Sequence, residues 1–370
     1  MKNYKIALLA GDGIGPEVMK EAVKVLELIQ ERNDVIFELM PALFGASAYF
    51  DNGNPFPDET IAICDQADAI LKGTIGLSHE ESKNIPIELQ PERGALLPLR
   101  KRYNTYANFR PVYLPKELIH FSPLKPEIIG EGIDIIMVRE LVGGLYFGKK
   151  EMGTTEDGLR YVRETLEYDE DQIRRVLHEA FKLAMRRKKV LHNIHKSNVL
   201  KSSVLWNEVL EEVAQEYPEV EVLHQLVDSA ATQLCLNPCQ FDVMVMENMF
   251  GDILSDQGGG ILGSLGLMPS ACLGPDKAYY EPSHGSAPDI AGQNIANPYS
   301  MIGSVAMMLE NSFGMQEEAT NVWNAMKGVF GDGFSTPYLS RPDSGVNMIS
   351  TDAFGSKVVE KLRNMPRVGN

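Results

Sequence analysis

The chain has 370 residues, of which 44% are hydrophobic and 23% are charged. These values are close to the globular average and exclude a largely disordered or collagen-like chain, and the length predicts two to three domains. A net charge of −16 would repel phosphate backbones and anionic lipids, so we expect no nucleic-acid and no membrane partner. An anionic small substrate remains possible if basic residues gather locally.

The cysteine pattern does not predict a disulfide scaffold, because the chain contains only Cys64, Cys235, Cys239 and Cys272. Cys235 and Cys239 form a C-x3-C pair, but no second Cys or His pair has zinc spacing, so we expect buried structural thiols. The apolar run at residues 6–10 is too short for a signal-peptide core. The longest uncharged stretch, 257–275, contains six Gly and two Pro and is no membrane span. We expect a cytoplasmic protein.

The first third of the chain alternates predicted strands and helices. Pro16 suits the first position of an amphipathic helix. The pattern predicts strands at residues 5–10, 35–40 and 69–71, and helices at 16–30 and 61–67. Such alternation is typical of an α/β fold with a parallel, doubly wound sheet.

The middle of the chain begins with a strand at 133–138 and a glycine-containing arm at 144–155. It continues with strands at 190–194, 221–227 and 241–246 and helices at 171–187, 202–217 and from Gly251 onward. After Gly263 we expect loops, followed by helices at 297–312 and 353–362.

A glycine-rich turn, GDGIGP, occupies residues 11–16 after the first predicted strand. The phosphate-binding fingerprint of Rossmann folds requires glycine where Pro16 stands. The second predicted strand also lacks the terminal acidic residue that would bind a ribose. We therefore interpret the segment as a tight turn between a strand and a helix.

Basic and apolar residues occur together at 96–102 (LLPLRKR) and 108–111 (NFRP). Arg139 follows an apolar strand, at the edge where open α/β sheets bind ligands. Arginine binds carboxylates through two parallel hydrogen bonds. The spacing alone leaves open whether these residues form a carboxylate site or a solvated basic surface.

Two carboxylates, Asp252 and Asp256, are four residues apart in a predicted helix and therefore share one face. Their repulsion would be relieved by a cation between them, and Mg²⁺ or Mn²⁺ prefers such oxygen ligands. An exposed acidic face is the alternative. Asp228, at the end of another predicted strand, favours a metal site.

Two further segments are candidates for binding or catalysis. Residues 284–292 (HGSAPDIAG) form a loop of small residues before a predicted helix, which would allow a cofactor to approach the backbone. Lys196 follows a predicted strand and is either a base of lowered pKa or an ordinary surface lysine.

Taken together, five segments resemble signatures of the metal-dependent β-hydroxyacid oxidative decarboxylases, a family that includes isopropylmalate, isocitrate, homoisocitrate and tartrate dehydrogenases. They are, in order, residues 11–18 (GDGIGPEV), 93–101 (RGALLPLRK), 139–148 (RELVGGLYFG), 248–256 (NMFGDILSD) and 281–298 (EPSHGSAPDIAGQNIANP). The resemblance covers nearly the whole chain. The RGALLPLRK and REL segments are most similar to members that oxidise isopropylmalate.

The resemblance implies a fold of two α/β domains with a cleft between them. Residues 1–107 and 263–370 would form the cofactor-binding domain, and residues 108–262 the substrate, metal and dimerisation domain. The active site would be shared by the two subunits of a homodimer, with NAD and Mg²⁺ or Mn²⁺ as cofactors. The substrate would be a small hydroxy dicarboxylate.

The family also implies a role for each site residue. Arg100, Arg110 and Arg139 would bind the two carboxylates, and Leu96 and Leu97, with Val199 of the partner, would hold an isopropyl group. Metal ligands would be Asp252, Asp256 and the partner's Asp228, which also borders the substrate. Lys196 of the partner would be the base and Tyr146 the acid. NAD would contact Ile14, Asn198, His284, Gly285, Ser286, Ala287, Asp289 and Asn297, and the charge of Asp289 would disfavour the 2′-phosphate of NADP.

Three departures from the isopropylmalate pattern concern the substrate rather than the reaction. His195 replaces an aspartate, residues 73–77 (GTIGL) replace a Gly-Gly-Pro turn, and Gly258, Gly259 and Gly260 stand where helix formers are expected. Homoisocitrate, isocitrate and tartrate or malate are the alternative substrates. A non-catalytic regulatory subunit is a further alternative, although Lys196, Tyr146 and the three aspartates are all present.

Overall fold

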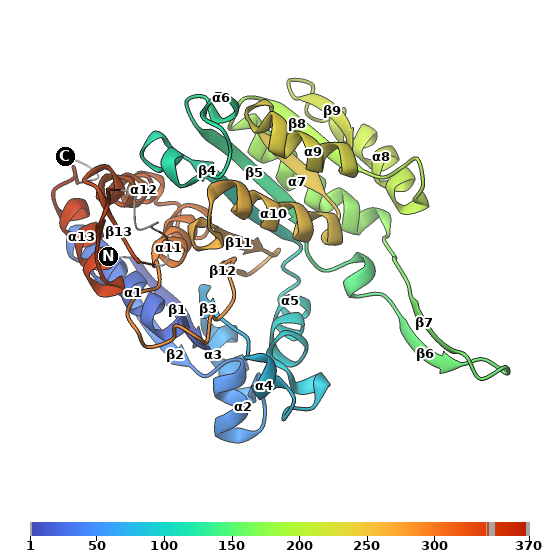
Figure 1. The fold of residues 1–370 in the computed structure, drawn as a ribbon, viewed down its shortest axis with the longest axis horizontal. Coiled ribbons are helices and arrows are strands. Elements are labelled where there is room, and N and C mark those ends of the chain that lie inside the picture. Colours follow the sequence, from blue (N-terminus) through green and yellow to red (C-terminus); the bar gives the residue numbers. More distant parts are fainter. Residues whose placement is uncertain (1, 338, 340–344, 368–370) are drawn as a thin grey trace.

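A computed structural model describes residues 2–337, 339 and 345–367. A mixed ten-stranded sheet runs through the molecule in the order β2-β1-β3-β12-β11-β4-β5-β10-β8-β9 (Figure 1). Helices pack along this sheet, so the α/β class expected from the sequence is confirmed. The two ends of the sheet are parallel, as predicted, but its centre is not.

One end of the sheet comes mainly from the first third of the chain. Its parallel strands are β2 (Val35–Ala42), β1 (Lys2–Gly11), β3 (Ala69–Thr74) and β12 (Ala278–Pro282). The helices of this end are α1 (Gly15–Arg32), α2 (Ala46–Asn52), α3 (Asp58–Gln66), α4 (His79–Ser82), α5 (Leu97–Arg102), α11 (Tyr299–Asn311), α12 (Gln316–Gly331) and α13 (Thr351–Arg363). Helix α1 is placed by one apolar face, where Val18, Ala22, Val25 and Ile29 are all fully buried.

The centre of the sheet is antiparallel and consists of β11 (Pro269–Leu273), β4 (Ala107–Leu114) and β5 (Ile133–Glu140). The sequence predicts β5 but neither β4 nor the two strands β11 and β12, which replace part of the expected loop after Gly263. Both β11 and β12 have five residues, which is too short for a clear alternation of polar and apolar side chains.

The other end of the sheet contains β10 (Val243–Met246), β8 (Val190–His195) and the edge strand β9 (Glu221–Leu226). Its helices are α6 (Pro126–Ile129), α7 (Glu170–Met185), α8 (Lys201–Ala214), α9 (Val227–Leu236) and α10 (Asn248–Leu262). Strand β9 ends at Leu226, one residue before the predicted end, so Asp228 does not directly follow the strand. Asp228 lies in the first turn of α9, which the sequence did not predict.

The predicted arm, 144–155, contains the short helical turn Gly144–Tyr146 and strand β6 (Lys150–Thr154). Strand β6 forms an antiparallel hairpin with β7 (Arg160–Glu164), which the sequence analysis did not predict. Figure 1 shows the hairpin projecting away from both ends of the sheet. A further two-stranded sheet joins β13 (Phe334–Ser335) and β14 (Asn347–Met348).

The unexpected glycines Gly258, Gly259 and Gly260 lie inside helix α10. A Cβ atom at Gly258 would lie 2.5 Å from Val112 Cγ2 of β4, and one at Gly259 would lie 2.4 Å from Leu265 Cδ2. The first two glycines therefore allow α10 to pack closely against its neighbours. A Cβ at Gly260 would meet no atom within 4 Å.

The cysteines agree only partly with the prediction. Cys64 and Cys272 are buried free thiols, but Cys235 and Cys239 are exposed, so the expectation of buried thiols is wrong for the C-x3-C pair. Both lie near the end of α9, where the chain turns at Asn237 and Pro238.

One predicted domain limit, between residues 107 and 108, falls one residue inside β4, and the other coincides with the end of α10 at Leu262. The division itself stays a prediction.

Across the residues that the structure describes, no helix combines the length and the apolar character needed to cross a membrane.

Candidate active site

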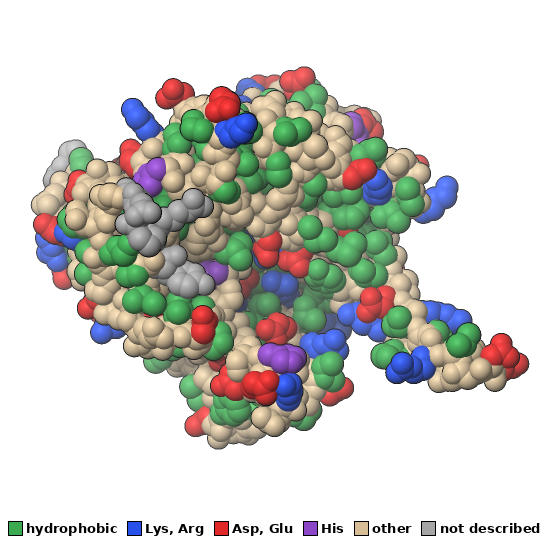
Figure 2. Space-filling model, in the orientation of Figure 1, with side chains coloured by type: hydrophobic (Ala, Val, Ile, Leu, Met, Phe, Trp, Pro, Cys, Tyr) green, Lys and Arg blue, Asp and Glu red, His purple; other side chains and the backbone are tan. Residues whose placement is uncertain are grey.

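Most of the predicted substrate residues line one cavity of about 360 Å³. The sequence-predicted residues in its lining are Leu96, Leu97, Arg100, Arg110, Arg139, Tyr146, Asp252, His284 and Gly285. Figure 2 shows the recess between the upper and lower parts of the molecule, with acidic and basic side chains inside it. The basic residues are thus a cluster lining a cavity and not a solvated surface.

The antiparallel pairing of β4 and β5 brings two of these arginines together. Asn108 of β4 lies opposite Arg139 of β5, so Arg110 is two positions away on the neighbouring strand. Alternate residues of a strand share a face, and diagonal neighbours across two strands are within reach of long side chains. Arg100 joins the same cavity from helix α5.

Arg110 is held by neutral side chains and by the two aspartates of α10. Its Nε donates to Asn108 Oδ1 at 2.9 Å and its Nη1 to Ser255 Oγ at 2.7 Å. The same Nη1 lies 3.4 Å from Asp256 Oδ1 and 3.8 Å from Asp252 Oδ1. The guanidinium is therefore buried, oriented and close to both predicted metal ligands.

Arg139 is only 1% exposed and is oriented by Asn248, the first residue of α10. Its Nε and Nη2 donate to Asn248 Oδ1 at 3.0 and 2.8 Å, and its Nη1 forms an ion pair with Asp252. Burial and the nearby Arg110 lower the pKa of Arg139 to about 10, so it stays charged at neutral pH.

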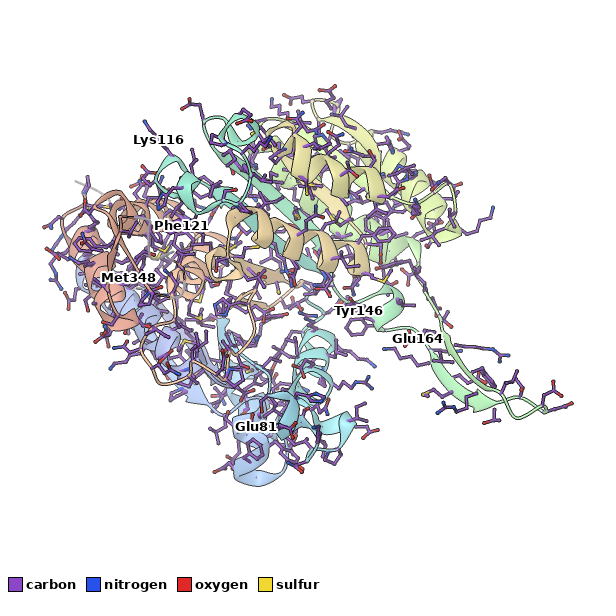
Figure 3. The ribbon with its side chains drawn as sticks, viewed as in Figure 1. Glu81, Lys116, Phe121, Tyr146, Glu164 and Met348 are labelled. Carbon is purple, nitrogen blue, oxygen red and sulfur yellow. The ribbon has the colours of Figure 1, made fainter. Side chains whose placement is uncertain are left out.

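Asp252 joins the arginines to Tyr146. Tyr146 Oη donates to Asp252 Oδ2 at 2.8 Å, while Oδ1 of the same carboxylate faces Arg139 and Arg110. Burial would raise the pKa of Asp252, but the two arginines outweigh it and lower that pKa. Burial and the Asp252 carboxylate raise the pKa of Tyr146 to about 12. Figure 3 shows Tyr146 at the base of the arm, between the two parts of the molecule.

Three charged residues of the cavity, Lys72, Glu92 and Glu281, were missed by the sequence analysis. Lys72 of β3 is 1% exposed, and its Nζ lies 2.6 Å from Glu281 Oε2 of β12. Arg100 Nη2 lies 3.7 Å from the other oxygen of Glu281. The signal available was a lysine inside an apolar strand. With Arg100, Arg110 and Arg139, Lys72 makes four basic side chains against the three carboxylates Glu92, Asp252 and Glu281.

The remaining predicted catalytic residues lie elsewhere. Lys196, Asn198, Val199 and Asp228 are not in the lining of this cavity. Lys196 Nζ forms an ion pair of 2.9 Å with Asp228 Oδ1 at the far end of the sheet. Asp252 and Asp256 share one face of α10, as predicted, but nowhere in the described chain do three or more His, Cys, Asp or Glu side chains form a group that could hold a metal.

A second cavity, of about 390 Å³, adjoins the first through His284 and Gly285, which line both. Five residues predicted to bind NAD line it, namely Ile14, His284, Gly285, Ala287 and Asn297. His284 Nε2 is buried without a hydrogen-bond partner among the described residues. The lining also includes Gly263, Ser264, Leu265 and Gly266, which the sequence analysis did not identify.

Two predicted cofactor residues border this cavity without lining it. Ser286 is buried, and its backbone oxygen accepts a hydrogen bond from Ile14 N at 2.8 Å, which ties the small-residue loop to the turn after β1. Asp289 belongs to the small-residue loop, and its side chain is exposed. The GDGIGP segment is a tight turn, as predicted, with positive φ at Gly11 and Gly13.

Comparison with known proteins adds independent evidence. The family described as "Isocitrate/isopropylmalate dehydrogenase" matches residues 5–358. The 3-isopropylmalate dehydrogenase of Carboxydothermus hydrogenoformans is 48% identical over 97% of this chain and 95% of its own length. The enzyme of that name from Thermotoga maritima is 47% identical over 98% of this chain and 99% of its own.

A solved structure agrees with this assignment. The isocitrate dehydrogenase of Methylococcus capsulatus superposes with a TM-score of 0.84 and 33% identity, covering 98% of this chain and all of its own. Both the sequence relatives and this structure extend over nearly the full chain. With the buried arginine cavity and the adjoining small-residue loop, they show that the chain is an enzyme that belongs to the isocitrate/isopropylmalate dehydrogenase family.

Proposed function

We propose that this enzyme catalyses the NAD-dependent, divalent-metal-dependent oxidative decarboxylation of 3-isopropylmalate to 2-oxoisocaproate in leucine biosynthesis. The observation that carries the proposal is a cavity in which three arginines lie beside Leu96 and Leu97. Relatives at 47–48% identity that are named for this substrate support it.

Substrate binding follows from the chemistry of the cavity. Arg100, Arg110 and Arg139 are charged donors that would bind the two carboxylates of a dicarboxylate substrate. Leu96 and Leu97, at the junction with helix α5, would contact the branched apolar group. Burying that group against leucine stabilises the complex by ~0.8 kcal/mol per methylene.

The donor set of α10 fits a divalent cation. Asp252 and Asp256 are one turn apart on the same helix face, so their carboxylates could supply two oxygen ligands. Asp228 of a partner subunit would complete the oxygen ligands that Mg²⁺ or Mn²⁺ prefers. When bound, the cation would act as a Lewis acid that stabilises negative charge developing on the substrate.

Proton transfer would use Tyr146 and Lys196. Because the pKa of Tyr146 is raised to about 12, its hydroxyl keeps its proton at neutral pH and can donate it to C3 after CO₂ has left. Lys196 of a partner subunit would accept the C2 hydroxyl proton while hydride leaves C2 for NAD⁺. The substrate loses a hydride, the C2 hydroxyl proton and CO₂, and C3 gains one proton, so the reaction balances.

The second cavity supports NAD binding. Its small-residue loop allows backbone approach, and the unpaired His284 Nε2 offers a hydrogen-bonding atom where the two cavities meet. The exposed carboxylate of Asp289 beside the loop would repel a 2′-phosphate, which favours NAD over NADP.

We also propose that the enzyme is a cytoplasmic homodimer with shared sites and two domains, 1–107 with 263–370 and 108–262. Lys196 and Asp228 lie outside the arginine cavity of their own chain, so one chain alone lacks the complete set of catalytic residues. The cavity between the two ends of the sheet is where two such domains would meet.

The same chemistry on isocitrate or homoisocitrate is the second candidate. The observation that favours it is Lys72, a buried cation in the cavity that an additional carboxylate could contact. Its ion pair with Glu281 already neutralises that charge, which is why we place isopropylmalate first. Malate and tartrate lack the branched apolar group, so Leu96 and Leu97 would have no substrate group to contact.

The test is a panel of hydroxyacids assayed with NAD⁺ and Mn²⁺ by NADH absorbance. We expect the highest kcat/KM for 3-isopropylmalate, loss of turnover with EDTA and recovery with Mg²⁺ or Mn²⁺. Faster turnover of isocitrate would favour the second candidate. Full activity after removal of divalent metal would contradict the metal requirement, and no turnover of any hydroxyacid would indicate a regulatory subunit.

A further inference from the structure

Two buried glutamates and a partly buried tyrosine meet behind the turn that carries Tyr146, and the proposed mechanism uses none of them. Glu140 ends β5, Glu247 precedes α10, and Tyr168 lies in the segment before α7. Glu140 is fully buried and Glu247 is 7% exposed. We call these three residues the carboxyl–tyrosine cluster.

The Tyr168 hydroxyl lies between the two carboxyl groups. Its Oη is 3.2 Å from Glu140 Oε2 and 3.3 Å from Glu247 Oε2, and it accepts a hydrogen bond of 3.0 Å from Asn248 N. Glu140 also accepts backbone hydrogen bonds from Val142 and Gly143, and Glu247 accepts two from the first turn of α10.

Counting hydrogens shows that this arrangement lacks one. A tyrosine hydroxyl has a single hydrogen, so it can donate fully to only one of two ionised carboxylates. The other contact would then join two acceptor oxygens, and two negative charges would share a buried site. One additional proton on a carboxyl oxygen removes the conflict, because that carboxyl then donates to Tyr168 while Tyr168 donates to the other.

The cluster contacts the catalytic turn directly. A Cβ atom at Gly143 or Gly144 would lie 2.5 Å from atoms of Tyr168, so the Tyr168 side chain packs closely against this backbone. Gly144 has a φ of +70°, which favours glycine. Tyr146 is two residues further on, within the same helical turn.

The cluster is also linked to Arg139 through Asn248. Asn248 N donates to Tyr168 Oη, its Nδ2 donates to Gly143 O at 3.0 Å, and its Oδ1 accepts both hydrogen bonds from Arg139. A shift of Tyr168 would therefore move both the turn that carries Tyr146 and the residue that orients Arg139.

We propose that Glu140, Glu247 and Tyr168 hold one additional proton between them below neutral pH and act as positioning residues for Tyr146. Glu140 holds this proton, and its loss at higher pH loosens the Gly143–Tyr146 turn. The positioning role rests on the function proposed above, whereas the bound proton does not.

The surrounding charges agree with a proton on Glu140. Burial raises the pKa of Glu140 to about 7, against the opposing effect of its backbone hydrogen bonds and of Arg175 on α7. Burial also raises the pKa of Glu247, and Arg139 on β5 opposes this shift. Arg175 lowers the pKa of Glu140 and Arg139 lowers that of Glu247, but burial raises both pKa values by more.

The first test measures the proton directly by infrared spectroscopy of the full-length protein. The carbonyl stretch of a protonated carboxylic acid should be present at about pH 6, decrease by about pH 8.5, and be absent from Glu140→Gln. Glu151→Gln is the matched control, because Glu151 accepts a hydrogen bond from Tyr161 on the exposed hairpin. An identical pH difference spectrum in Glu140→Gln and wild type would overturn the proposal.

The second test uses thermal stability. A carboxyl whose pKa rises from 4.5 to about 7 on folding stabilises the protein below the lower value, and this contribution is lost as pH rises through the higher one. Glu140→Gln keeps a donor towards Tyr168 but leaves Gly143 N–H without its acceptor. We therefore expect a lower Tm for the variant at about pH 5 and a smaller deficit, or none, at about pH 8. A constant difference would contradict the proposal.

The third test concerns positioning. Tyr168→Phe should lower kcat by ~10-fold or more with a smaller change in KM, because small misplacement of a catalytic group costs rate rather than binding. Tyr161→Phe removes a similar hydroxyl from the hairpin and should change neither. Glu140→Gln should retain more kcat than Glu140→Ala. Unchanged kcat in Tyr168→Phe would overturn the positioning role, whereas a protein inactive on all hydroxyacids would still give the infrared and Tm results.

Discussion

The centre of the sheet and its β9 edge contain the two halves of the predicted catalytic set in very different states. At the centre, Arg139 is 1% exposed and every predicted substrate arginine has hydrogen-bonding partners. At the edge, Val199 is 69% exposed and the Asp228 side chain 65% exposed, and Lys196 forms an ion pair with Asp228.

This difference indicates that the two halves are completed in different ways. A buried arginine needs its partners within the same fold, because an unpaired buried charge is costly. An exposed valine beside an exposed ion pair has no such requirement and is available to a second subunit. The central half is therefore prebuilt, and the proposal of a shared site predicts that the edge half joins a site only when a second subunit binds.

The largest effect is expected from an experiment that places one inactivating substitution in each half of the catalytic set. Arg110→Ala should inactivate the enzyme because it removes a side chain that binds a substrate carboxylate. Lys196→Met should inactivate it because it removes the base. When the two inactive proteins are refolded together, one site of each mixed dimer contains both intact residues. Random pairing makes half of the dimers mixed, so about a quarter of wild-type activity should return.

The control for this experiment is each variant refolded alone, which should stay inactive. Mixed dimers must be demonstrated, for example by a different tag on each chain. A mixture that contains mixed dimers but stays inactive would show that each site is built within one chain, and would contradict the partner role of Lys196.

The next prediction concerns the carboxylate at the middle of the central half. Asp252→Asn removes a proposed metal ligand and the counter-charge of Arg139 and Arg110. We expect kcat to fall by roughly 100-fold or more. Asp276→Asn, on the exposed turn between β11 and β12, is the control and should leave kcat unchanged. Equal kcat values for both variants would exclude Asp252 from catalysis.

A smaller effect is expected from the apolar part of the cavity. Leu96→Ala combined with Leu97→Ala removes methylenes worth ~0.8 kcal/mol each when fully buried, and both leucines are only half-buried. The kcat/KM for 3-isopropylmalate should fall by ~10-fold or more, and that for malate, which lacks the branch, by less. Equal losses on both substrates would show that these leucines support the fold rather than the substrate.

The sequence predicted the fold best where elements are long and periodic. Helices α1 and α7 and strands β1, β5 and β8 lie within a few residues of their expected positions. The signal for α12 was also present, since Val322, Ala325, Met326 and Val329 are buried at helical spacing, but it was not used. Strands β11 and β12 had no comparable signal, and their antiparallel pairing depends on contacts distant in sequence.

The site divides in the same way. Motifs identified Arg100, Arg110, Arg139 and Asp252, and the structure brings them together. The sequence offered for Lys72 only a lysine inside an apolar strand and for Tyr168 only a tyrosine in a loop, and neither carries a spacing signal. Their importance comes from Glu281 and Glu140, which are distant in the chain and become neighbours only through the sheet.

The smallest predicted effect separates the two faces of α10, which connects the centre of the sheet to the surface. Gly260→Ala places a Cβ in open space and should raise the free energy of unfolding by ~1 kcal/mol, the difference in helix propensity between the two residues. Gly258→Ala gains the same propensity but brings a Cβ to 2.5 Å from Val112 Cγ2. Because Val112 is fixed within β4, overpacking should outweigh the gain and lower stability by about 1–3 kcal/mol. Urea denaturation of both variants measures the two values, and changes of the same sign would show that the tight face of α10 can relax.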